Sequence, residues 1–131
     1  MDRQELKQRL ITFAARVYRL QSVVKRRGAP DFANQMVRSS SSVGANYHEA
    51  IHARSRTEFI AKIKLAESEA EETHYWLSLV ASSGIVKPES LANLIDEARQ
   101  IVAILHATAE TSKNNTSRTG KSNPAPPTNK S

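Results

Sequence analysis

His48, Glu49 and His52 form the pattern His-Glu-x-x-His, whose side chains are of the types that hold a catalytic zinc ion. On a helix, this spacing places two imidazoles one turn apart, with a carboxylate beside them as a general base. Glu72, on the next predicted helix, is a candidate third ligand. Zinc proteases with this motif bind substrate along a strand edge, and this sequence predicts no strand. Both histidines also lie off the apolar face of their helix. We therefore predict no metal site and keep a zinc hydrolase as a remote alternative.

A second metal chemistry is suggested by Glu49-x-x-His52 and Glu71-x-x-His74, which have the Glu-x-x-His spacing of di-iron helical bundles. Such a site requires every ligand to face one core and further glutamates from the other two helices. The first predicted helix offers only Glu5, near its start. We therefore expect neither a di-iron site nor any other cofactor.

Glu69 and Glu72 interrupt a second apolar stripe of the third predicted helix. Buried carboxylates must be paired or hydrogen-bonded, because an unpaired buried charge is costly. The second predicted helix offers partners in its serine run and in Arg38, with Arg54 just beyond it. We prefer a structural polar network to a catalytic acid and base pair, since no nucleophile with an orienting base is evident. The residues assigned to this network are Ser41, Asn46, Glu49, Glu69 and Glu72.

One side of the first predicted helix is basic, and its charged residues lie off the apolar seam. Such a stripe is the electrostatic footprint of phosphate binding. The alternative is a solvated face, or an ion-pair partner for the acidic helices of a neighbouring subunit, and the sequence leaves both interpretations open. The residues assigned to nucleic-acid binding are Arg9, Arg16, Arg19, Lys25, Arg26 and Arg27.

The chain has 131 residues, of which 39% are hydrophobic, enough for one domain with a modest core. Its net charge of +6 is unevenly distributed. Residues 1–27 contain eight Lys and Arg against two acidic side chains, whereas residues 57–112 contain four against nine. Cysteine is absent, and we find neither a secretory signal nor an apolar run of the roughly 20 residues that span a bilayer. We expect a cytoplasmic protein with no membrane partner.

Apolar residues recur at alternating spacings of four and three, which predicts four amphipathic helices. Gly28-Ala29-Pro30 ends the first helix, and Asp31 and Thr57 are candidate N-caps of the second and third. Ser83-Gly84 then ends the third helix, and Pro88 begins the fourth. The second helix is poor in large side chains, with a predicted seam at Ala33, Val37, Ser40, Gly44, Tyr47 and Ile51.

Short connections between these helices favour an all-α fold, an antiparallel up-down-up-down four-helix bundle. We place the bundle domain at residues 1–112. From Lys113 onward no large apolar residue occurs, and three prolines lie among Asn, Ser and Thr. Residues 113–131 are therefore predicted to be a disordered basic tail.

The third predicted helix carries a second apolar stripe besides the one that faces the core. If it were uncovered, this stripe would present an apolar patch to water, and such patches mark interaction sites. We therefore predict a homo-oligomer. The residues assigned to the oligomer interface are Leu65, Trp76 and Leu79.

Several short patterns also follow one another along the chain. They are a serine run at 39–42, Asn46-x-x-Glu49-Ala50, Ser55-x-x-Glu58-Phe59, a glutamate-rich helix and Tyr75-Trp76-Leu77. Together they resemble the four helix bundle protein family, which is also named for intervening sequences in the large-subunit ribosomal RNA of some bacteria. The resemblance spans roughly residues 6–105, and His48 and His52 fall at positions that its pattern leaves free.

The resemblance implies a bundle assembled as a closed five-fold ring, so we expect a homopentamer. It also implies a likeness to the accessory proteins of diversity-generating retroelements, with RNA, DNA or a partner protein such as a reverse transcriptase as partners. Together with the basic stripe, this predicts a non-catalytic, homo-oligomeric module that binds nucleic acid without reading its sequence. The alternative is a structural or protein-binding scaffold in which the arginines serve the subunit interface.

Overall fold

Four α-helices make up the described part of the chain, and none of residues 1–119 lies in a strand. The structure is a computed structural model that describes residues 1–119, with side chains described for residues 1–115. The helices are α1 (Arg3–Arg26), α2 (Pro30–Ile51), α3 (Arg56–Ser83) and α4 (Pro88–Thr119). The prediction of an all-α chain with four helices is confirmed.

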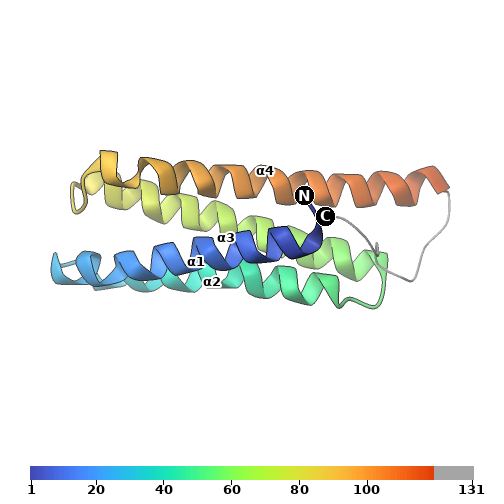
Figure 1. Cartoon of the computed structure of the whole chain (residues 1–131), viewed down its shortest axis with the longest axis horizontal. Helices are drawn as coiled ribbons and strands as arrows, with labels where there is room; N and C mark the ends of the chain where they lie inside the picture. Colours follow the sequence, from blue (N-terminus) through green and yellow to red (C-terminus); the bar gives the residue numbers. More distant parts are fainter. Residues whose placement is uncertain (120–131) are drawn as a thin grey trace.

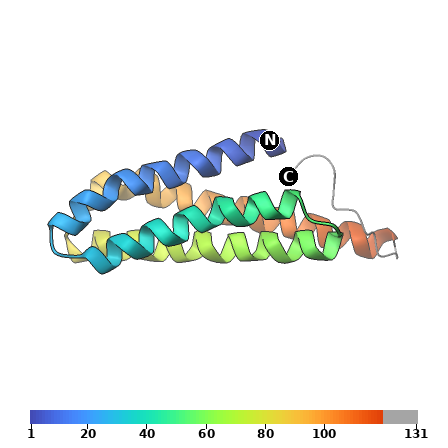
Figure 2. The same cartoon turned by 90° about the horizontal axis from the view of Figure 1, so that it is seen from below.

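The helices lie roughly along one long axis, and the chain reverses direction at each connection (Figure 1). α2 packs against α1 on one side and against α3 on the other, and α4 packs against α3. α1 and α4 contact each other much less. Figure 2 shows α1 leaning away from the other helices toward its N-terminus. The axis of α1 therefore diverges from those of the other helices in its first half, although Leu6 and Leu10 there are fully buried.

The helix ends that follow the sequence pattern are set by local chemistry. Asp2 and Glu5 form a capping box, in which each side chain accepts a hydrogen bond from the other residue's backbone N–H at 2.8 Å. This satisfies two N–H groups that the start of α1 would leave unpaired. Gly84 ends α3 with φ 79°, a left-handed conformation that costs glycine little. α4 begins at Pro88, as predicted.

Two predicted N-caps are wrong. α2 begins at Pro30 with no side-chain cap, and Asp31 lies inside its first turn; proline has no N–H to satisfy and its fixed φ suits the first helical position. Ser55 caps α3, because its backbone is extended and its Oγ accepts from the N–H of Glu58 at 3.1 Å. Thr57 is already helical.

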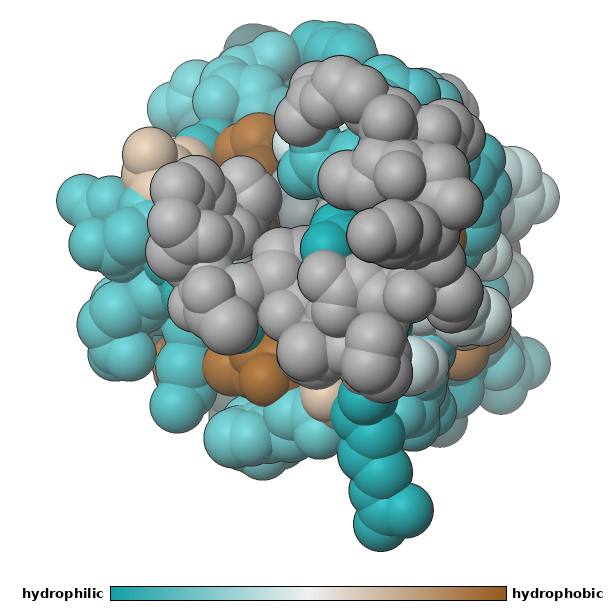
Figure 3. Space-filling view, turned by 90° about the vertical axis from the view of Figure 1, so that its right-hand side faces the viewer, coloured by the Kyte–Doolittle hydropathy of each residue, from teal (hydrophilic) through white to brown (hydrophobic). Residues whose placement is uncertain are grey.

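The core is formed by one face of each helix, and the seams predicted for α3 and α4 are fully buried. Because the apolar side chains point inward, the described surface at one end of the bundle is mainly hydrophilic, with small separate hydrophobic areas (Figure 3). No helix among residues 1–119 has the length and hydropathy needed to cross a membrane. The buried seam residues are Phe59, Ile63, Ala66, Ala70, Thr73, Leu77 and Val80 on α3, and Leu91, Leu94, Ala98, Ile101, Leu105 and Ala109 on α4.

The seam predicted for α2 is partly wrong. Val37, Gly44 and Ile51 are only half-buried. α2 lies between α1 and α3, so its buried face is wider than one seam, and its small residues give little contrast between faces. The large or apolar residues that are fully buried instead are Met36, Val43 and Ala50.

The end of α4 also differs from the prediction. The helix continues to Thr119, beyond the predicted domain end at Ser112. Ser112 itself is buried, and Lys113 forms an ion pair with Glu110 at 3.2 Å on the same helix. Residues 113–119 of the predicted tail are therefore helical, and residues 120–131 lie outside the described residues.

The core assignment predicts that Phe13→Ala lowers the free energy of unfolding by about 3 to 5 kcal/mol, because it leaves a cavity where a fully buried ring now lies. Tyr18→Ala, on the exposed side of the same helix, should change it by less than about 0.5 kcal/mol. Urea denaturation followed by circular dichroism measures both. Equal decreases in the two variants would contradict this core.

Candidate functional site

The basic stripe of α1 does not act as one surface, because Arg9 is committed to α4. Its Nε lies 2.7 Å from Glu97 Oε2, and its Nη2 donates to Glu97 Oε1 at 2.9 Å and to Gln100 Oε1 at 2.8 Å. The Arg9 side chain is only 26% exposed. The hydrogen bond to Glu97 raises the pKa of Arg9 further, so Arg9 stays charged at every ordinary pH. Arg9 therefore holds α1 against α4, where the two helices otherwise contact little.

Arg27 is also engaged within the chain. It is the C-cap residue of α1, and its Nη1 donates to the backbone carbonyl oxygen of Ile85 at 2.8 Å. Ile85 belongs to the connection between α3 and α4. Arg27 thus ties two loops together at one end of the bundle.

The other four predicted nucleic-acid-binding residues form no such contact with another part of the chain. Within residues 1–115, no hydrogen bond or ion pair joins the side chains of Arg16, Arg19, Lys25 or Arg26 to another residue. Arg19, Lys25 and Arg26 are exposed and Arg16 is half-buried. They occupy the second half of α1 and offer uncompensated positive charge to a partner.

Arg16 and Arg19 also line an open cavity of about 330 Å³ between α1 and the start of α4. Leu20 contributes an apolar wall from α1, and Ser90 and Leu91 contribute from the first turns of α4. Two guanidinium groups beside a concave surface can approach a phosphate from two directions. The cavity therefore joins two basic side chains to a concave surface.

Glu69 and Glu72 meet Arg38 across the contact between α2 and α3. Arg38 Nη1 lies 3.2 Å from Glu69 Oε1, and Arg38 Nη2 is bonded to Glu72. Trp76 Nε1 donates to Glu72 Oε2 at 3.0 Å. The hydrogen bond from Trp76, followed by that from Arg38, lowers the pKa of Glu72, and the bond to Glu72 raises that of Arg38. Both carboxylates therefore serve as ion-pair partners of Arg38 in the contact between α2 and α3. Arg54 takes no part in this cluster.

The rest of the predicted polar network is dispersed. Ser41 Oγ donates to the carbonyl oxygen of Val37 at 2.7 Å, and Asn46 Nδ2 donates to that of Ser42 at 2.9 Å, so both bond within α2. Glu49 pairs instead with Lys62 Nζ at 2.6 Å. The five residues therefore form four separate arrangements. A sequence pattern shows which residues share a helix face but not which long side chains meet.

The two histidines of the zinc motif lie next to each other. The ring centroids of His48 and His52 are 4.6 Å apart in an edge-to-face arrangement, and both side chains are exposed. Glu49 turns to Lys62, and Glu72 is held by Arg38 and Trp76. No group of three or more His, Asp or Glu side chains in the described part of the chain is arranged to hold a metal ion.

The predicted oligomer interface is only partly exposed. Leu65 is 51% exposed on α3. The Trp76 ring packs within the chain, with its centroid 5.9 Å from that of Phe32, and Leu79 is half-buried. Trp76 therefore belongs mainly to the contact between α2 and α3.

Besides Met1, three other apolar side chains are about as exposed as Leu65, and sequence reasoning missed them. Ile11 and Tyr18 on α1 are 50% and 60% exposed, and Tyr75 on α3 is 57% exposed. Ile11 and Tyr18 are seven residues apart and share one face of α1. The sequence did indicate that Tyr18 is exposed, because Tyr18 lies off the apolar seam, between Arg16 and Arg19.

Comparisons with known proteins give a matching family and a similar solved structure. The family model described as 23S rRNA-intervening sequence protein matches residues 2–107. A similar solved structure is a protein of unknown function from the S23 ribosomal protein family of Bacteroides thetaiotaomicron, with 31% sequence identity and a TM-score of 0.75. The match covers 79% of this chain and 97% of that one. A search of curated proteins gives no match.

The contrast between Arg9 and Arg19 predicts different effects of removing them. Arg9→Ala should lower the free energy of unfolding by about 1 to 2 kcal/mol, since it breaks a two-pronged ion pair and leaves Glu97 half-buried without its partner. Arg19→Ala should change it by less than about 0.5 kcal/mol. Urea denaturation of both variants at the same salt concentration measures the difference. A decrease in Arg19→Ala as large as that in Arg9→Ala would contradict these separate roles.

Proposed function

Because the chain belongs to the 23S rRNA-intervening sequence protein family, as its sequence patterns predicted, we propose that it is a non-catalytic homo-oligomer that binds nucleic acid through the phosphate backbone. The proposed subunit is an up-down-up-down bundle, and the proposed assembly is a closed ring of five copies. RNA and duplex DNA are both candidate ligands. The observation that carries the proposal is the uncommitted positive charge on the second half of α1.

The positions of the basic side chains on α1 support contacts with phosphates more than recognition of bases. Arg16, Arg19, Lys25 and Arg26 lie along one half of a single helix, and two of them line the cavity beside α4. Tyr18 provides one exposed ring for stacking, whereas binding of single strands by stacking uses successive aromatic side chains. Binding should therefore tolerate different sequences and weaken steeply with salt. Several copies in one ring would multiply the basic surfaces and raise the avidity.

The proposal of a non-catalytic protein rests on how the candidate catalytic side chains are used. A catalytic zinc ion needs three protein ligands and an open position. His48 and His52 supply two, while Glu49 and Glu72 accept hydrogen bonds from Lys62, and from Arg38 and Trp76. Moving either carboxylate to a metal would break an ion pair between helices.

Nucleic-acid binding is tested by reversing charge where the arginines are uncommitted. Arg16→Glu with Arg19→Glu should weaken binding in gel-shift titrations and lower the slope of log affinity against log salt by about one for each phosphate that is no longer neutralised. The titrations use structured RNA and duplex DNA at two salt concentrations. Arg9 is left unchanged, because reversing it would break the contact between α1 and α4.

The matched control makes the same change in net charge elsewhere, with Arg54→Glu and Arg99→Glu. Both residues are exposed, the first just before α3 and the second on α4. This control should bind almost as well as the wild type. If the wild type shows no binding at low salt while its oligomer is intact, nucleic-acid binding is contradicted. If Arg16→Glu with Arg19→Glu instead dissociates the oligomer, the scaffold alternative is favoured.

The proposal that the chain is not a zinc enzyme is tested by metal analysis. Protein purified from a medium that contains zinc should hold far less than one zinc ion per chain, and His48→Ala should not change that amount, because two histidines alone hold the ion weakly. Nearly one zinc ion per chain in the wild type, absent from His48→Ala, would overturn the non-catalytic proposal.

A further inference from the structure

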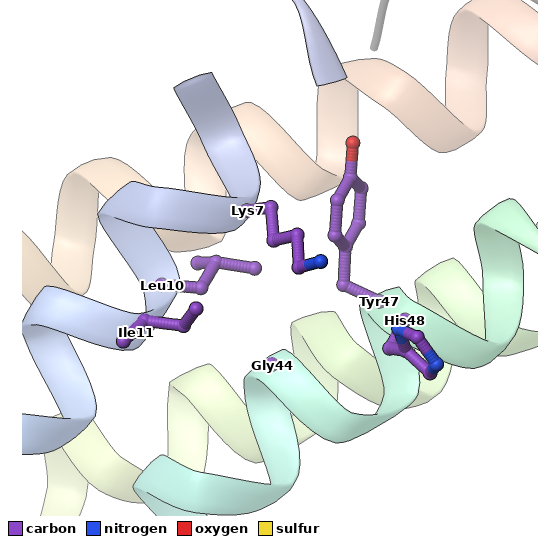
Figure 4. A pocket seen from close by; sticks show the side chains of 6 residues that line it. All are labelled: Lys7, Leu10, Ile11, Gly44, Tyr47 and His48. Carbon is purple, nitrogen blue, oxygen red and sulfur yellow. The ribbon is translucent and has the colours of Figure 1, made fainter. Parts of the chain in front are cut away.

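An apolar cavity of about 220 Å³ opens between α1 and α2 (Figure 4). Its floor is formed by Leu10 and Tyr47, which are buried in the core, and Ile11 stands at its edge. The cavity exists because Gly44 has no side chain to fill the space that α2 leaves opposite α1. A Cβ added to Gly44 would meet only Leu10 Cβ at 3.7 Å, which is ordinary contact.

Lys7 places a positive charge at the rim of the cavity. Lys7 reaches across it from α1, and His48 stands on the α2 side (Figure 4). α1 as a whole has seven Lys and Arg against one Glu. An occupant with apolar side chains surrounded by negative charge would therefore suit the cavity better than a neutral one.

The outer face of α3 carries both exposed apolar side chains and negative charge. Leu65 and Tyr75 are exposed on the side of α3 away from its buried seam. Glu71 is exposed beside Tyr75, whereas Glu69 and Glu72 pair with Arg38 and Lys64 is exposed beside Leu65. The negative charge that this face offers to a partner is therefore at its Tyr75 end, where it complements the positive charge of Lys7 at the apolar cavity on another surface of the same chain.

We propose that α3 of a second copy docks on the cavity between α1 and α2, with the Leu65 and Tyr75 side of α3 facing Ile11 and Gly44. This inference rests on the proposed homo-oligomer and specifies its interface. The two contacting surfaces are different, so the contact is head-to-tail, and each copy uses one surface on either neighbour. Such contacts close into a ring when the rotation between copies allows it.

The cavity is tested by filling it. Gly44→Phe directs a ring toward the cavity from a Cβ that makes only ordinary contact with Leu10, and Ile11→Asp puts a charge at the exposed edge of the cavity. Both should reduce the oligomer to monomers in sedimentation velocity, with the helical circular dichroism spectrum unchanged. The control Ala103→Phe, an exposed position on α4, should remain oligomeric. If both cavity variants remain fully oligomeric, the interface is elsewhere.

Because the chain has no cysteine, the pairing of the two surfaces can be tested directly. The double variant Ile11→Cys with Tyr75→Cys, treated with a short bis-maleimide, should give a ladder of covalent multimers, as should Ile11→Cys with Leu65→Cys. Each single variant, and Ile11→Cys with Ala103→Cys, should give no ladder.

The outcomes separate this inference from the function on which it rests. A wild-type chain that sediments as a monomer contradicts the proposed homo-oligomer and the interface with it. A stable wild-type oligomer in which neither double variant forms a ladder overturns this interface alone and leaves the nucleic-acid proposal intact. A ladder in either double variant, together with monomers in Gly44→Phe, supports the interface.

Discussion

The burial of small polar residues along α2 is the constraint on which the other packing depends. Ser39 and Ser40 are buried, and each hydroxyl donates to a carbonyl oxygen within α2, so neither leaves an unpaired polar group in the core. Ser39 Oγ also accepts from Thr73 Oγ1 of α3 at 2.8 Å. With such short side chains, α2 can lie close to both α1 and α3. α2 and α3 are thus the two central helices, each packed against the other and against one outer helix, and the outer helices α1 and α4 are left with little contact.

That arrangement explains how the ionic contacts are used. Where helices pack closely through small residues, Arg38 adds a peripheral ion pair to a contact that already exists. Where α1 and α4 contact little, Arg9 and Glu97 supply a two-pronged polar link between them. The same residue type thus stabilises the fold at one position and remains uncommitted at Arg16 and Arg19. Arg9 and Arg38 differ from Arg16 and Arg19 in having an acidic residue of another helix within reach.

The sequence predicted the parts of the fold in which large apolar side chains alternate with polar ones. The seams of α3 and α4 are correct at every position, because Phe, Ile, Leu and Val recur along them at heptad spacing. The seam of α2 is partly wrong because Ala, Ser and Gly bury almost equally well on any face. The pairing of Arg9 with Glu97 was not predicted, since it joins residues 88 positions apart, and periodicity carries no information on such contacts. The end of α4 was placed too early because a polar helix beyond the core resembles a tail in composition.

The two proposed uses of α1 are compatible because they involve different parts of the helix. The cavity for a second copy lies beside Lys7 and Ile11, in the half of α1 that leans away from the bundle. The uncommitted charges at Arg16, Arg19, Lys25 and Arg26 lie in the other half. Docking an acidic α3 on the first half would neutralise Lys7 and leave the second half available to phosphates. An assembly built in this way would therefore concentrate basic surfaces along one end of the bundles, which is the arrangement that a polyanion spanning several subunits requires.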